Sequence, residues 1–125
     1  MTRAFYSIIQ YCPNHFRQEC VNVGLVLLQE NTRNIACRMT TDLSRVSKLF
    51  DMSSGDLVNL QFSMDGMVSR IDNTIPFLTE SEMAHFAATR ANDLKMTEPR
   101  LAKIEDFEAD FRRLFKQLVE TPILK

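Results

Sequence analysis

The sequence has few glycines, no excess of basic residues and no long apolar run, and each shortage excludes a class of protein. Its three glycines are too few and too scattered for a Walker loop, a glycine-rich dinucleotide turn or a nucleophile elbow. Nucleotide chemistry therefore has no support. Fifteen Lys and Arg stand against sixteen Asp and Glu, whereas proteins that bind phosphate backbones carry a basic excess. Nucleic acid is accordingly an unfavourable candidate partner.

The apolar and cysteine content bears on location. No apolar run approaches the roughly 20 residues that a membrane helix needs, and residues 1–7 lack the apolar core and cleavage site of a secretory signal. We therefore expect a cytoplasmic protein without membrane association. The three cysteines, Cys12, Cys20 and Cys37, are an odd number and lie in or beside strand-like segments. That usage suits reduced thiols, so the sequence predicts no disulfide.

The first third of the chain has the two-residue period of strands. A chain of 125 residues buries enough surface to fold as one domain, and we expect a single α+β domain over residues 1–125. Strands are predicted over 5–11, 20–29 and 35–39, joined as an antiparallel three-stranded meander. The face that Arg38 occupies depends on the length of the turn before it and stays open.

Strict alternation in the second strand divides its side chains between two faces. We predict that one face is the core and contains Val21, Val23, Leu25 and Leu27. The other face then contains Asn22, Gly24, Val26 and Leu28. Gly24 is disfavoured in a strand, and it indicates the close approach of another backbone or side chain.

The period becomes helical in the middle of the chain. Asp42 can cap a short helix that runs to Phe50, and apolar residues recur at helical spacing over 57–71. Thr79 and Glu82 form a capping box at the start of a further helix, which is expected to end near residue 90. Four methionines are interpreted as core residues rather than as an adaptable groove: Met64, Met67, Met83 and Met96.

The last third predicts a short strand and an amphipathic helix. Residues 94–99 could form a fourth, edge strand, and Pro99 marks where its pairing stops. Apolar residues over 104–119 make a helical stripe, with Asp106 favouring the N-terminal end of the helix dipole. This helix is expected to cover the sheet, so three or four helices pack against the meander.

The strongest polar cluster surrounds the first turn and contains Arg17, Glu19 and Asn22. Arg17 and Glu19 flank an exposed turn and could form a solvated ion pair of small energetic value. Asn22 is more informative, because an amide inside an apolar strand must find partners or cost about 1–3 kcal/mol. We favour its satisfaction by a neighbouring loop; a contact with a ligand or partner is the alternative.

A second polar group contains Arg90 and Asn92. Both suit the end of the helix that precedes them, Arg90 through the helix dipole and Asn92 as a left-handed cap. Together with Arg17, Glu19 and Asn22 they are our candidate partner-binding residues.

Metal and thiol chemistry is weakly supported. The spacing of Cys12, His15 and Cys20 offers three soft ligands, but a fourth ligand and paired knuckles are missing. A nucleophilic pair between a cysteine and His15 or His85 requires a contact that nothing in the sequence fixes. We expect no metal, no cofactor and no catalytic residue.

The motifs YSIIQY at 6–11, PN at 13–14, RQECVNVGLVL at 17–27 and FRRLFKQLV at 111–119 resemble the bacterial domain-of-unknown-function family three-thousand-thirty-seven. Arg90 and the short strand after it are similar to a later block of that family. Cys12 and Cys20 depart from the pattern, which argues further against a thiol or zinc site. The family has no established activity, and its members are often encoded beside a HipA-like kinase. The resemblance therefore implies an accessory or regulatory partnership.

Three functions follow as hypotheses. The first is a non-enzymatic regulatory module that contacts a protein, with a HipA-like kinase as the first candidate partner. The second is a small enzyme or anionic-ligand binder that uses Arg17, Asn22 and Arg90 to hold a phosphate or carboxylate. The third is a mobile-element protein that inhibits a host defence complex. Oligomeric state does not follow from the sequence.

Overall fold

The computed structural model describes residues 3–14, 19–88 and 94–120. Along these residues the elements are, in chain order, β1 (Ala4–Asn14), β2 (Glu19–Gln29), β3 (Ile35–Met39), α1 (Ser44–Phe50), α2 (Ser54–Thr74), α3 (Glu80–Ala88), β4 (Leu94–Met96), β5 (Arg100–Ala102), α4 (Phe107–Phe115) and a π-helical turn, η1 (Lys116–Glu120).

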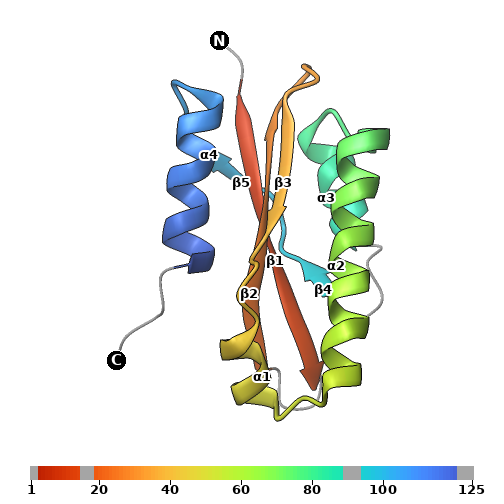
Figure 1. Ribbon diagram of the computed structural model, residues 1–125. Helices are drawn as coiled ribbons and strands as arrows, with labels where there is room; N and C mark the ends of the chain where they lie inside the picture. The colour runs from red at the N-terminus through yellow and green to blue at the C-terminus, as the bar shows by residue number, and fades with distance from the viewer. Residues whose placement is uncertain (1–2, 15–18, 89–93, 121–125) are drawn as a thin grey trace.

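An antiparallel five-stranded sheet forms the centre of the molecule, in the order β3-β2-β1-β4, with β5 also beside β1. Helix α4 covers one face of this sheet, and α2 and α3 cover the other (Figure 1). The predicted α+β class and the β1-β2-β3 meander are confirmed. Among the described residues, every helix is too short or too polar to cross a lipid bilayer.

The edge beside β1 contains two short strands where the sequence predicted one. β4 pairs with residues 9–11 and β5 with residues 4–6 of the same strand. Between them, the Thr97 hydroxyl accepts a hydrogen bond from the Ile8 amide at 2.8 Å, and the Thr97 amide donates to the Ile8 carbonyl at 2.9 Å. Pro99 therefore interrupts the edge without ending it, because Thr97 satisfies the backbone of β1 across the break.

A β-bulge in β2 overturns the predicted single core face. Ile9 pairs with Gly24, whereas the following residue, Gln10, pairs with Asn22, which leaves Val23 as an extra residue in β2. An extra residue reverses the alternation of all side chains beyond it. The prediction was wrong because a strict period of two assumes an uninterrupted strand.

As a result, both faces of β2 are buried core. The core on the α2 face takes Val21 and Val23 from before the bulge and Val26 and Leu28 from after it. The core on the α4 face takes Leu25 and Leu27 instead. The hairpin register also places Arg38 on this α4 face, with its guanidinium 4.7 Å from the centre of the Phe115 ring.

The larger core lies between the sheet and α2. Helix α2 contributes a buried stripe at helical spacing, as the sequence predicted: Leu60, Met64, Met67 and Ile71. Each of the four methionines assigned to the core is at most 9% exposed, which confirms their role as apolar filling. The smaller core contains Phe111, Phe115 and Val119 from the C-terminal helix, so that helix covers the sheet as expected.

The predicted helix starts are confirmed with small adjustments. The Glu82 amide donates to the Thr79 hydroxyl at 3.2 Å, while the Glu82 carboxylate accepts from the Leu78 amide at 2.8 Å. Asp106 accepts from the Ala109 amide at the start of α4. The N-cap of α1 is Leu43 rather than Asp42, although the Asp42 carboxylate still accepts from the first helical amide at 3.0 Å.

Gly24 stands at a close approach between strands, as the sequence indicated. A Cβ atom built on Gly24 would collide with the sulfur of Met39, and would lie 3.0 Å from the Arg38 carbonyl oxygen and 3.3 Å from the Ile9 Cβ. Its backbone needs no positive φ. Gly24 is therefore required because its neighbours leave no room for a side chain, and not because of its backbone conformation.

The structure overturns the prediction that no disulfide forms, because Cys12 and Cys20 are bonded to each other. Tyr11 pairs with Val21, and Asn14 pairs with Glu19, which places the two cysteines opposite each other near the end of the β1-β2 hairpin. The prediction rested on the odd number of cysteines, and that number does not show which cysteines the β1-β2 register brings together. Cys37 is the remaining free thiol and is buried.

Candidate functional site

The C-terminal end of η1 is held by two side chains that come from distant parts of the chain. The last carbonyl groups of a helix have no partner within the helix. Here the Asn22 side-chain nitrogen donates to the Leu118 carbonyl at 2.9 Å, and an Arg45 guanidinium nitrogen donates to the Val119 carbonyl at 3.0 Å. The positive charge of Arg45 also complements the negative end of the helix dipole.

Gln10 fixes the orientation of Asn22. The Gln10 amide nitrogen donates to the Asn22 side-chain oxygen at 2.9 Å, and these two residues are cross-strand partners in β1 and β2. The half-buried Asn22 amide is therefore satisfied on both its oxygen and its nitrogen. The prediction that the Asn22 amide is hydrogen-bonded within the protein is confirmed. Its partners are Gln10 and the C-terminal helix, whereas a neighbouring loop was expected.

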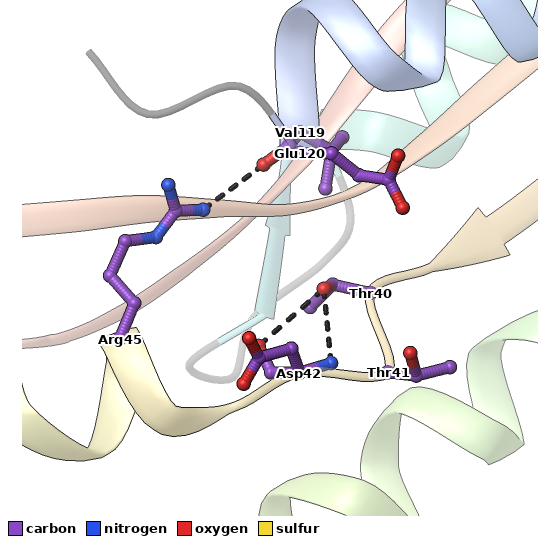
Figure 2. A pocket seen from close by; sticks show the side chains of 6 residues that line it. All are labelled: Thr40, Thr41, Asp42, Arg45, Val119 and Glu120. Atoms are coloured by element: carbon purple, nitrogen blue, oxygen red, sulfur yellow. Dashed lines mark hydrogen bonds between the residues drawn. The ribbon is translucent and has the colours of Figure 1, made fainter. Parts of the chain in front are cut away.

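A surface hollow of about 360 Å³ opens beside this helix end. Its lining comes from the segment between β3 and α1, from α1 itself and from the last turn of the C-terminal helix: Thr40, Thr41, Asp42, Arg45, Val119 and Glu120. Figure 2 shows Arg45 reaching across to the Val119 carbonyl, with Thr40 hydrogen-bonded to Asp42 below it. We refer to these six residues as the helix-end hollow.

The helix-end hollow carries charges of both signs. Hydrogen bonds from Ser44 lower the pKa of the Asp42 carboxyl below its usual value, and the nearby Arg45 lowers it further, so this carboxylate is ionised at neutral pH. A guanidinium has five N–H donors, and the contact with Val119 uses one nitrogen of Arg45. The hollow can therefore hydrogen-bond to both acceptors and donors.

The remaining predicted site residues fall at the limits of the described chain. Arg17, Arg90 and Asn92 lie outside the described residues. Glu19 begins β2 through its backbone pairing with Asn14, and its side chain is likewise outside the description. Of the five predicted contact residues, the structure therefore places only the side chain of Asn22. Its hydrogen bond to the Leu118 carbonyl is next to the Val119 carbonyl that Arg45 binds in the helix-end hollow.

The sequence pattern missed Arg45 and the hollow. Arg45 lies in the first turn of a short helix, where a basic side chain opposes the helix dipole, and this local mismatch was the available signal. Its favourable interaction is with the opposite end of another helix, 74 positions along the chain. Only tertiary packing brings these groups together.

The described residues offer little for metal or thiol chemistry. No group of three or more His, Cys, Asp or Glu side chains that could hold a metal ion occurs among them. Burial, with a smaller effect of Asp72, raises the pKa of the Cys37 thiol to about 12, so this thiol is neutral at physiological pH. His85 is exposed on α3, and His15 lies outside the described residues.

Replacement of Asn22 by aspartate is expected to loosen the C-terminal helix. The variant Asn22→Asp keeps the shape of the side chain but removes the donor to the Leu118 carbonyl, leaving two oxygens facing each other. We expect the free energy of unfolding to fall by about 2 kcal/mol at pH 7, measured by urea denaturation. Repulsion raises the folded-state pKa of the new carboxyl above its unfolded value, so the loss should shrink as the pH falls through that raised pKa and should be smallest at pH ~4 and below.

Asn73→Asp is the matched control for this prediction. The exposed Asn73 donates to the Ser69 hydroxyl, which can rotate and donate to a carboxylate instead. This variant should change the free energy of unfolding by less than about 1 kcal/mol. Equal losses in the two variants at pH 7 would contradict the role assigned to Asn22.

Comparison with known proteins identifies a family. The family model described as "Protein of unknown function (DUF3037)" matches residues 6–119, which include all of the described elements except the first two residues of β1 and the last residue of η1. No curated protein and no solved structure matches the chain. The match extends over most of the 125 residues, and the chain therefore belongs to the DUF3037 family of proteins of unknown function.

Proposed function

We propose that this protein is a non-enzymatic regulatory module that binds another protein at the helix-end hollow and the adjoining β1-β2 hairpin. The observation that carries the proposal is the composition of the hollow. Arg45, Asp42 and Glu120 bring charges of both signs to one concave surface, which two threonines also line. A polypeptide segment presents the same mixture of charged side chains, carbonyl groups and amides.

The charge arrangement favours a protein over a free anion. Arg45 alone would attract a phosphate or carboxylate, but Asp42 and Glu120 line the same hollow and would repel it. The alternative anion site of Arg17, Asn22 and Arg90 gains no support from Asn22, because its amide nitrogen is engaged by Leu118. Arg17 and Glu19 remain proposed contacts at the hairpin.

The first candidate partner is a HipA-like kinase. This choice rests on the association that the family resemblance implies. In the proposed mechanism, docking restrains or positions the kinase, and this protein contributes no catalytic group. Arg45 would pair with a carboxylate of the partner, while Asp42 and Glu120 would pair with its basic residues.

The test is binding of a purified HipA-like kinase from the same genome, measured by isothermal titration calorimetry. Thr41→Trp fills the hollow with a bulky side chain, and Thr41 is exposed. We expect the dissociation constant to rise at least tenfold, which corresponds to a loss of about 1.4 kcal/mol of binding free energy. Ser81→Trp, at an exposed position on α3, is the matched control and should bind as the wild type does.

Arg17→Glu tests the hairpin part of the same surface. It should also weaken the kinase complex, because it reverses a charge proposed to face a carboxylate. Unchanged binding by both Thr41→Trp and Arg17→Glu would refute the proposed surface. If the wild-type protein fails to bind the kinase at all, the choice of a HipA-like partner is wrong.

A further inference from the structure

The disulfide between Cys12 and Cys20 is on the side of the β1-β2 hairpin that faces the C-terminal helix. Tyr11 and Val21 are paired beside it, and both of their side chains belong to the core on the α2 face. Side chains alternate between the two faces of a sheet along each strand. The cysteine side chains are therefore directed toward the α4 face.

The disulfide is close to the pair of residues that holds the end of the C-terminal helix. Residues two positions apart in a strand share a face, so Gln10 lies beside Cys12 and Asn22 lies beside Cys20. Gln10 donates to the Asn22 side-chain oxygen, and the Asn22 side-chain nitrogen donates to the Leu118 carbonyl. The disulfide, this amide pair and the helix end therefore follow one another along the same face of the hairpin.

The first part of β2 is paired on one side only. β3 pairs with residues 24–28 of β2, whereas within the described chain residues 19–22 pair with β1 alone. Register shifts interrupt this pairing at both ends, the first at the Val23 bulge and the second between Tyr11 and Asn14. β1 itself is fixed on its other edge by β4. The disulfide therefore joins a weakly paired segment of β2 to a firmly held segment of β1.

The two cysteines differ in their access to solvent. Cys12 is 1% exposed, whereas Cys20 is classed among the exposed residues of the chain. Thiol–disulfide exchange begins when a thiolate attacks one sulfur of the bond, and an incoming thiolate reaches this bond at Cys20. The third cysteine, Cys37, is buried, so the attacking thiol must come from another molecule.

We propose that the bond between Cys12 and Cys20 is a site of reversible exchange with an external dithiol, and that its redox state controls the hydrogen bond from Asn22 to the C-terminal helix. A thiolate of the dithiol attacks the Cys20 sulfur, the bond between the cysteines breaks, and Cys12 leaves as a thiolate that takes up a proton. The second thiol of the dithiol loses its proton and displaces Cys20, which takes up a proton in turn. The dithiol is thereby oxidised to a disulfide, two electrons reduce the cysteine pair, and the reverse exchange restores the bond.

Reduction should loosen the start of β2 and release the Leu118 carbonyl. Without the disulfide, residues 19–22 depend on their short, interrupted pairing with β1, and movement of this segment separates Asn22 from the helix end. Val119 and Glu120 of that helix end line the helix-end hollow, so the redox state also affects one wall of the hollow. This inference does not depend on the proposed kinase interaction.

The test compares the oxidised protein with the protein reduced by dithiothreitol, using nuclear magnetic resonance of the folded state. The resonances of the Asn22 side-chain amide and the Leu118 carbonyl carbon should both shift on reduction, because the hydrogen bond between them is lost. Both should return when glutathione disulfide restores the bond. The side-chain amide of Asn73, which donates to Ser69 on α2, is the internal control and should not shift.

Asn22→Ala tests whether the effect passes through this side chain. In this variant the Leu118 carbonyl should resemble that of the reduced wild type and should not respond to dithiothreitol. A Leu118 carbonyl that is the same in both redox states of the wild type, or that responds equally in Asn22→Ala, would contradict the proposal. A reduced protein that unfolds as a whole, with loss of the Asn73 signal, would also contradict it.

Single cysteine variants test where exchange begins. Iodoacetamide should modify Cys20 in Cys12→Ser about tenfold faster than Cys12 in Cys20→Ser, because access governs the reactivity of a thiol. Mass spectrometry of the modified peptides measures the two rates and separates them from modification of Cys37. Equal rates for Cys12 and Cys20 would refute the entry of the dithiol at Cys20.

Discussion

Replacing Gly24 with valine should lower the free energy of unfolding by about 3 kcal/mol. The first added atom alone would collide with the Met39 sulfur and approach the Arg38 carbonyl oxygen to 3.0 Å. Met39 can rotate away, but the backbone of β3 cannot move without disturbing its pairing with β2. For a chain of this length the midpoint of thermal unfolding should fall by about 10 °C, as measured by circular dichroism.

Two further glycine variants make this prediction specific. Gly24→Ala adds only the Cβ atom, so it should have a smaller effect in the same direction. Gly66→Ala is the opposite case, because its Cβ meets open space in the middle of a helix, and it should stabilise the protein by about 0.5–1 kcal/mol. A Gly24→Val variant as stable as the wild type would show that the β2-β3 contact is looser than described.

Breaking the bond between Cys12 and Cys20 should lower the free energy of unfolding by about 2–3 kcal/mol. The bond joins residues eight positions apart, and a loop of this size restricts the unfolded chain by about that amount. Urea denaturation of the wild type with and without a thiol-free reductant measures the loss. Tyr11 and Val21, which pair next to the cysteines, should then exchange their amide hydrogens faster.

The double variant Cys12→Ser with Cys20→Ser separates the bond from other effects of the reductant. It should match the reduced wild type in stability and should not respond to reductant itself. Cys37 remains in both proteins and is buried, so its contribution is the same. If reductant leaves the wild-type denaturation midpoint unchanged, the two thiols are unpaired in solution, as the cysteine count first suggested.

Local patterns were sufficient for most elements. The β3 range of Ile35–Met39 is as predicted, since a five-residue alternation bounded by turn residues has one simple interpretation. The capping residues Thr79 and Asp106 were predictable because their hydrogen bonds join groups three residues apart. The buried stripe of α2 followed from helical spacing alone.

Pairing between strands caused the errors. The bulge at Val23 depends on how Ile9 and Gln10 pair with β2, and the sequence of β2 alone does not predict it. The same pairing aligned Cys12 with Cys20 across the hairpin. Thr97 continued the sheet edge past the point where Pro99 was expected to end it, through contacts with a residue 89 positions away.

By itself, the sequence determined the α+β class, the helices and the first strands, because these depend on neighbours within a few positions. It also identified Gly24 and Asn22 as unusual, because both residue types are disfavoured in a strand. The tertiary structure alone decided what those residues do. Asn22 holds a carbonyl of the C-terminal helix 96 positions away, and Arg45 joins it there. Such contacts depend on how the layers pack, and no local period encodes them.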